Sequence, residues 1–135
     1  MKAVNPYLNF KGNTEEAFNF YKSVFGGEFL ALIRFKDTPE AERVDPKDVE
    51  KIMHISLPLG KSNLLMATDA LESMGHSLAR GNDFYLSIDA ESEEEANTLF
   101  DALAQGGKVE VPMEKMFWGA FFGQLRDRFG IHWMI

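Results

Sequence analysis

One pattern of strand, helix and glycine pair occurs in both halves of the chain, and this repeat constrains the fold more than any other feature. Capping residues and glycine pairs are common in α+β proteins, so one match alone would mean little. Three matches in one order favour a duplication. They join Glu15-Glu16-Ala17 to Glu94-Glu95-Ala96 at an offset of 79, Gly26-Gly27 to Gly106-Gly107 at 80, and Leu64-Leu65-Met66 to His132-Trp133-Met134 at 68.

The first half predicts one helix among four strands. Asn13 is a candidate helix N-cap, and Glu16, three residues later, can complete a capping box with it. Apolar residues then recur at helical spacing, and Gly26-Gly27 ends the helix. Asp37–Glu50 is acidic, contains two prolines and predicts a long loop. The predicted strands are Val4–Phe10, Glu28–Lys36, Lys51–Leu59 and Ser62–Thr68, the last two joined by a tight turn at Gly60-Lys61.

The second half repeats this order. A capping box at Ser92–Glu95 starts a helix that ends before Gly106-Gly107. The predicted strands are Asp83–Asp89, Lys108–Glu114, Met116–Leu125 and Gly130–Ile135, with Leu86 matching Leu8 at an offset of 78. The later fall in offset is what an insertion at Asp37–Glu50 would cause. We therefore predict an α+β fold, a single domain over 1–135 with βαβββ modules at 1–69 and 83–135 and a linker at 70–82.

Composition excludes several classes of protein. The 14 Lys and Arg residues against 21 Asp and Glu give a formal charge of −7, and the basic residues are scattered, so we expect no nucleic-acid and no anionic-membrane partner. There is no cysteine, which excludes disulfides and thiolate chemistry. The first residues lack the apolar run of a signal peptide, and no apolar stretch approaches the roughly 18 residues of a membrane span. We expect a cytoplasmic protein.

The duplicated plan and several motifs resemble the vicinal oxygen chelate superfamily, which includes glyoxalase I, bleomycin-resistance proteins and extradiol dioxygenases. The resemblance is to its PhnB-like branch, whose members often bear the label 3-demethylubiquinone-9 3-methyltransferase. The motifs are Pro6-Tyr7-Leu8-Asn9-Phe10-Lys11-Gly12-Asn13, Phe20-Tyr21, Phe117-Trp118-Gly119 and the segment 127–135. The resemblance implies cupped mixed sheets around a cavity.

The resemblance also implies four metal-ligand positions, two in each module. They fall at or near Asn5 and Asp83 on the first strands and at Met66 and Met134 on the last strands. Thioether sulfur is a poor ligand for the divalent ions of this superfamily, so we expect no metal and no other cofactor. The methyltransferase label lacks support as well, because the chain shows neither the strand-helix alternation of a parallel sheet nor a glycine-rich turn.

Strand alternation selects the candidate pocket residues, since residues two apart share a face. Tyr7 and Asn9 share a face with Asn5, and Tyr85 and Ser87 share one with Asp83. His54 and Ser56 share a face with Ile52; His54 is a candidate general base or ligand donor, or else a partly buried structural imidazole. Further candidates are Asp69, with turn or cap duty as its alternative, Trp118 as a stacking residue, and Arg126 as a cationic anchor within a predicted hairpin turn.

Three functions fit these residues. The first is a metal-free pocket for a planar or aromatic small molecule, lined by Tyr7, His54, Asp83, Tyr85 and Trp118. The second is a lyase- or isomerase-type enzyme, with or without a divalent metal, in which His54 or Asp83 moves a proton next to a carbonyl. The third is a structural or regulatory dimer without a ligand, with its cavity filled by some of the 12 Phe and 7 Met side chains. The resemblance, together with the apolar surface that cupped sheets leave, predicts a homodimer.

Overall fold

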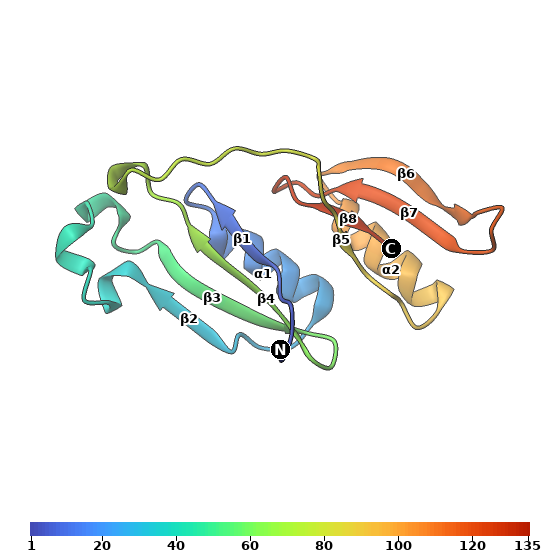
Figure 1. The fold of residues 1–135 in the computed structure, drawn as a ribbon, viewed down its shortest axis with the longest axis horizontal. Helices are drawn as coiled ribbons and strands as arrows, with labels where there is room; N and C mark the ends of the chain where they lie inside the picture. The colour runs from blue at the N-terminus through green and yellow to red at the C-terminus, as the bar shows by residue number, and fades with distance from the viewer. The chain divides into compact units, whose positions relative to one another are not determined.

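Each half of the chain forms a four-stranded mixed sheet with one helix on it (Figure 1). A computed structural model describes all residues, 1–135, in two units, Met1–Ala79 and Arg80–Ile135. The first unit contains β1 (Tyr7–Phe10), α1 (Thr14–Phe25), β2 (Ala31–Arg34), β3 (Ile52–Leu59) and β4 (Asn63–Asp69). Its sheet order is β1-β4-β3-β2, and only β1 and β4 run parallel.

The second unit has the same topology. It contains β5 (Leu86–Ser87), α2 (Glu93–Ala104), β6 (Lys108–Lys115), β7 (Phe121–Arg126) and β8 (His132–Met134). The sheet order is β5-β8-β7-β6, with β5 and β8 parallel. The α+β class and the two βαβββ modules are thus confirmed. Neither helix has the length and apolar character needed to cross a membrane.

One face of each sheet packs on its helix. In the first unit α1 lies against β3 and β4, and Phe18 and Tyr21 of the helix are fully buried. Alternate strand residues are buried with them, among them Leu8, Phe10, Ile55, Leu57, Leu65 and Ala67. In the second unit α2 covers β6 and β7, with Leu103, Leu125 and Trp133 buried. We call the other face of each sheet, which carries no helix of its own unit, the open face.

Several boundaries differ from the predictions. The strand predicted over Asp83–Asp89 contains only Leu86–Ser87, and the one predicted over Met116–Leu125 begins at Phe121. The segment predicted as a loop, Asp37–Glu50, contains short 3₁₀ turns, and its Val44 belongs to a small core shared with residues outside the segment. That core consists of Phe35, Val44 and Leu71, with Val49, Met53 and Met74 against it. The β3–β4 turn has three residues, Gly60–Ser62, because Leu59 pairs with Asn63.

Strand pairing corrects the alignment of the repeat by two residues. The offset of 68 holds for the last two strands, since Ser56 pairs with Met66 as Gln124 pairs with Met134. On the first strands, however, Met66 lies opposite Tyr7, whereas Met134 lies opposite Ser87. The offset there is therefore 80 rather than 78. The counterpart of Leu8 is Ile88, not Leu86; a shift of two residues keeps the face but changes every cross-strand neighbour.

Candidate functional site

The open face of the first sheet carries a pair of rings, Tyr7 and His54, from β1 and β3. The Tyr7 hydroxyl lies 3.1 Å from His54 Nδ1, and the ring centroids are 5.8 Å apart with planes 26° from parallel. Tyr7 is 46% exposed, yet partial burial raises the pKa of its phenol, which therefore keeps its proton at neutral pH. The pair presents aromatic surface and polar atoms to the same space.

The hydrogen bond between these rings allows two proton arrangements, because a hydroxyl both donates and accepts. When the Tyr7 hydroxyl donates to Nδ1, neutral His54 carries its hydrogen on Nε2 and can donate to a ligand acceptor. When Nδ1–H donates to the hydroxyl, Nε2 offers a lone pair and can accept a proton. His54 can therefore serve as a donor or as a base.

A bulge in β3 sets the orientation of His54. Ile33 pairs with His54 and Arg34 with Ile52, so Met53 has no partner on β2. An extra residue of this kind interrupts the alternation of faces. Ile52 is consequently only 1% exposed and belongs to the core, which corrects the prediction that it shares a face with His54. Ser56 is also buried, at 3% exposed, and Asn9 lies exposed on β1.

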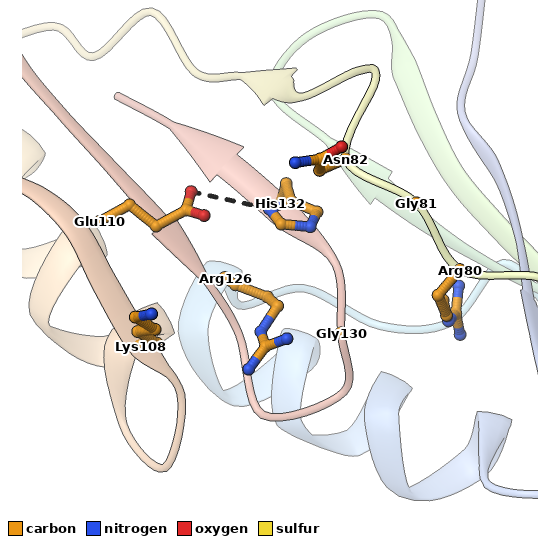
Figure 2. A pocket seen from close by; sticks show the side chains of 8 residues that line it. All are labelled: Arg80, Gly81, Asn82, Lys108, Glu110, Arg126, Gly130 and His132. Atoms are coloured by element: carbon orange, nitrogen blue, oxygen red, sulfur yellow. Dashed lines mark ion pairs between the residues drawn. The ribbon is translucent and has the colours of Figure 1, made fainter.

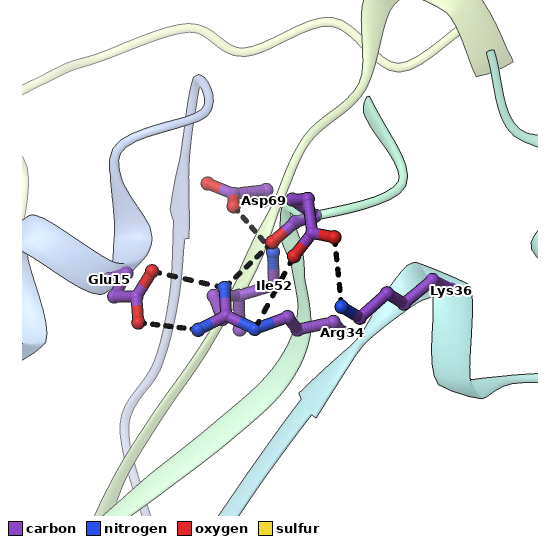
Figure 3. A network of polar contacts seen from close by, with 6 residues as sticks. Glu15, Arg34, Lys36, Ile52 and Asp69 are labelled. Atoms are coloured by element: carbon purple, nitrogen blue, oxygen red, sulfur yellow. Dashed lines mark hydrogen bonds and ion pairs between the residues drawn. The ribbon is translucent and has the colours of Figure 1, made fainter. Parts of the chain in front are cut away.

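Asp69 lies in the core, where it holds three elements together. Its Oδ1 accepts hydrogen bonds from the backbone N–H and the hydroxyl of Thr14, at 3.1 and 2.6 Å, and its Oδ2 accepts one from Ile52 N–H at 2.8 Å. Figure 3 shows Asp69 beside Ile52, in a network that also holds Arg34 against Glu15. The side chain is 1% exposed, so Asp69 performs the cap duty that was the alternative to ligand contact.

This arrangement corrects the prediction for the start of α1. Asn13 occupies the N-cap position, but its side chain makes no capping hydrogen bond. Asp69, distant in sequence, supplies the capping oxygens instead. At α2 one of the two hydrogen bonds of the predicted capping box forms, because Ser92 Oγ accepts from Glu95 N–H at 3.0 Å. The other does not form, since the Glu95 carboxylate accepts from the N–H of Glu91 rather than from that of Ser92.

The remaining predicted site residues lie in the second unit. Asp83 is exposed in the segment before β5, and Ser87 is exposed within it. The Tyr85 hydroxyl donates to Glu110 at 2.8 Å, and this hydrogen bond raises the pKa of the phenol. Trp118 lies in the β6–β7 turn, 59% exposed, where its ring contacts those of Phe117 and Phe122. The structure brings Tyr7 and His54 into contact. By contrast, no hydrogen bond or ring contact joins any two of the four second-unit residues, which are Asp83, Tyr85, Ser87 and Trp118.

A pocket of about 370 Å³ lies in the second unit, and sequence analysis did not predict it (Figure 2). His132 is one of its lining residues: its ring lies 5.0 Å from that of Tyr85, and its Nδ1 lies 3.6 Å from Glu110 Oε1. Arg126, predicted within a turn, is the last residue of β7. The lining residues are Arg80, Gly81, Asn82, Lys108, Glu110, Arg126, Gly130 and His132. From the sequence alone, alternation within each strand can predict that Arg126 and His132 lie on the same face of the sheet. It cannot predict which residues pair across neighbouring strands.

The positions implied to hold a metal have donors that do not suit a divalent ion. By strand register the counterpart of Asn5 is Tyr85, in place of Asp83. Asn5 Oδ1 already accepts from Leu64 N–H at 2.9 Å, and Met66 and Met134 offer only thioethers. No group of three or more His, Cys, Asp or Glu side chains in the chain is placed to hold a metal ion.

Comparison with known proteins places this chain among a group of similar bacterial proteins. The profile of the family described as 3-demethylubiquinone-9 3-methyltransferase matches residues 2–135. Protein YjdN of Escherichia coli K12 is 30% identical, with 98% of this chain and 92% of YjdN covered. The crystal structure of PA1353 from Pseudomonas aeruginosa is 40% identical with a TM-score of 0.86, covering 97% of this chain and 93% of that one. The PhnB protein from Bacillus cereus is 28% identical with a TM-score of 0.78, covering 97% and 95%.

More distant structures share the fold. A glyoxalase/bleomycin resistance protein/dioxygenase family enzyme from Burkholderia phytofirmans PsJN has a TM-score of 0.61 at 20% identity, over 96% of this chain and 94% of that one. This likeness concerns the fold alone. The resemblance to the PhnB-like branch is confirmed.

Proposed function

The chain belongs to the 3-demethylubiquinone-9 3-methyltransferase family, and we propose that it acts there as a small-molecule binding protein for a planar organic ligand. The observation that supports this is the Tyr7–His54 pair on the open face of the first sheet. Two near-parallel rings offer a surface on which a planar group can stack. Nε2 of His54 and the Tyr7 hydroxyl lie at its edge, where they can fix the orientation of a polar substituent.

Methyl transfer, which the family description names, is not part of this proposal. The usual S-adenosylmethionine fold has a doubly wound parallel sheet, whereas each sheet here contains one parallel pair among antiparallel strands. The turn from β1 to α1 contains one glycine, Gly12, and a Cβ there would meet the Lys51 side chain. These residues do not form the glycine-rich turn that such a cofactor fold uses.

The test measures the affinity of the protein for uncharged planar compounds, beginning with flavone and quinoxaline. Equilibrium binding is followed by NMR line-shape analysis. Tyr7→Leu removes the exposed ring, and a stacking contact is worth about 0.5–1.5 kcal/mol, so affinity is expected to fall roughly two- to twelve-fold. Phe84→Leu is the matched control, because Phe84 is an exposed ring, 66% exposed, outside the pair. Equal binding by Tyr7→Leu and the wild type, or no saturable binding of any compound, contradicts the proposal.

A second candidate is an enzyme that moves a proton next to a carbonyl. The Tyr7 hydroxyl fixes the His54 ring and, in one proton arrangement, leaves Nε2 free to accept a proton. Hydrogen–deuterium exchange at the α-carbon of hydroxyacetone in D₂O, followed by proton NMR, tests this. His54→Gln is expected to lose roughly 100-fold or more of any catalysed exchange. Loss in Asp83→Asn but not in His54→Gln would assign the base to Asp83, and no exchange above buffer would remove this candidate.

A further inference from the structure

Three basic side chains lie side by side across the open face of the second sheet. Lys108 of β6 pairs directly with Arg126 of β7, and Arg126 pairs directly with His132 of β8. Residues paired in this way point to the same face of a sheet. All three line the 370 Å³ pocket, and Figure 2 shows Arg126 between Lys108 and His132. We call Lys108, Arg126 and His132 the basic row.

Like charges directly opposite each other on neighbouring strands destabilise a sheet. A carboxylate between them would relieve the repulsion, but neither Lys108 nor Arg126 forms an ion pair or a side-chain hydrogen bond. A second pocket, of about 510 Å³ in the first unit, differs, because there Lys51 Nζ lies 3.8 Å from the buried Asp48, which also accepts a hydrogen bond from Ser73. Lys108 and Arg126 therefore retain uncompensated positive charge.

The one carboxylate in the pocket, Glu110, forms no ion pair with Lys108 or Arg126 and can pair only with His132, when that imidazole is protonated. Glu110 accepts the Tyr85 hydroxyl at 2.8 Å, and its Oε1 lies 3.6 Å from His132 Nδ1, which is too far for a hydrogen bond. The His132 side chain is only 11% exposed, and Nδ1 is buried without a hydrogen-bond partner. A buried polar atom of this kind is costly unless something bonds to it.

A third cationic residue also lines the pocket. Arg80 lines it beside Gly130, where a Cβ would lie 3.6 Å from Arg80 Nε. Lys108 and Arg126 against the one lining carboxylate, Glu110, give 2 − 1 = +1 before any proton on His132 is counted. The whole chain has a net charge of −7, so this local excess is not a consequence of composition.

We propose that the basic row binds the oxyanion group of a small molecule, either a carboxylate or a phosphoryl group. The planar guanidinium of Arg126 suits both geometries, with Lys108 beside it as a point charge. The pocket volume fits a single small ligand. This site does not depend on the planar-ligand proposal, because its residues all belong to the second unit.

The test is a titration of ¹⁵N-labelled protein with sodium phosphate and, separately, sodium benzoate, with ionic strength held constant by sodium chloride. Saturable shifts are expected at the amides of the basic row and at the His132 ring nitrogens. Arg126→Gln is expected to weaken binding roughly tenfold or more. Its melting temperature should equal or exceed that of the wild type, because the substitution removes a like-charge contact. Loss of binding then reports the site and not unfolding.

Lys115→Gln is the matched control, since Lys115 is on the same strand and carries the same charge but does not line the pocket. It is expected to bind the probes as the wild type does. Saturation by phosphate alone assigns a phosphoryl ligand, and saturation by benzoate alone assigns a carboxylate. Shifts that do not saturate, that chloride reproduces, or that persist unchanged in Arg126→Gln overturn the proposal. Uncharged planar compounds that bind while both anions fail would leave the proposed function standing and remove only this site.

Discussion

The two units have the same topology, yet they secure the start of their helices in different ways. At α2 the capping oxygen comes from Ser92, three residues before the N–H that it accepts. At α1 it comes from Asp69, 55 residues beyond Thr14 in sequence. The same carboxylate accepts from Ile52, so the first unit joins β3, β4 and α1 through one buried side chain. The N-cap of a helix can therefore come from a neighbouring residue in one unit and from a residue distant in sequence in the other.

The second unit also contains a buried carboxylate, but it stabilises a turn. Asp127 accepts from the N–H groups of Phe129 and Ile131 and from Trp133 Nε1, at 2.8, 3.0 and 2.9 Å. Its counterpart in the first unit, at an offset of 68, is Leu59. Duplication has preserved the topology and has allowed the polar contacts to move.

The largest expected effect is that of Asp69→Ala. Three hydrogen bonds to a buried charged acceptor are lost, and their donors remain buried, so we expect the free energy of unfolding to fall by about 3–5 kcal/mol. Urea unfolding followed by circular dichroism measures this. Asn13→Ala is the control and should change stability by less than about 0.5 kcal/mol, because Asn13 makes no capping bond. A larger loss in Asn13→Ala than in Asp69→Ala would reverse the assignment of the cap.

Ser92→Ala should have a smaller effect, about 1 kcal/mol, since it removes one exposed capping bond and leaves the rest of the second unit in place. Hydrogen exchange should show faster exchange at the first turn of α2 and little change in the sheet. If exchange accelerates throughout the second unit, the cap at α2 is not local, and the contrast between the two helices fails.

The smallest effect concerns the pair of Arg34 and Glu15 in the first unit. The Arg34 guanidinium, which donates to both Glu15 oxygens at 3.0 and 2.7 Å, lowers the pKa of Glu15 below its ordinary value of 4.5. A lowered folded-state pKa means that the stabilisation is present above the ordinary value and is lost as pH falls through the lowered one. Because Glu15 is 44% exposed, we expect less than about 1 kcal/mol.

The test measures the free energy of unfolding of the wild type and of Arg34→Met. The measurements run from neutral pH down to about one pH unit below the ordinary pKa of Glu15. The difference between the two proteins should shrink as pH falls. A difference that stays constant would show that Arg34 stabilises the unit by packing rather than by charge.

Local patterns predicted several elements of both units correctly. The apolar spacing of α1 and α2, the glycines after each helix and the Ser92 cap depend on residues within a few positions of one another. The predictions failed where residues far apart in sequence meet. Asp69 replaced Asn13 as the cap, the bulge at Met53 moved Ile52 into the core, and the first-strand offset proved to be 80.

The sequence by itself determined the α+β class, the duplicated modules and the family, because these follow from periodicity and motifs along the chain. Tertiary structure alone decided which side chains meet across strands: Tyr7 with His54, and Lys108 with Arg126 and His132. Alternation tells which face a residue occupies but not which residue lies opposite it. That register depends on turn lengths and bulges, and a change of two residues leaves the pattern intact while replacing every neighbour.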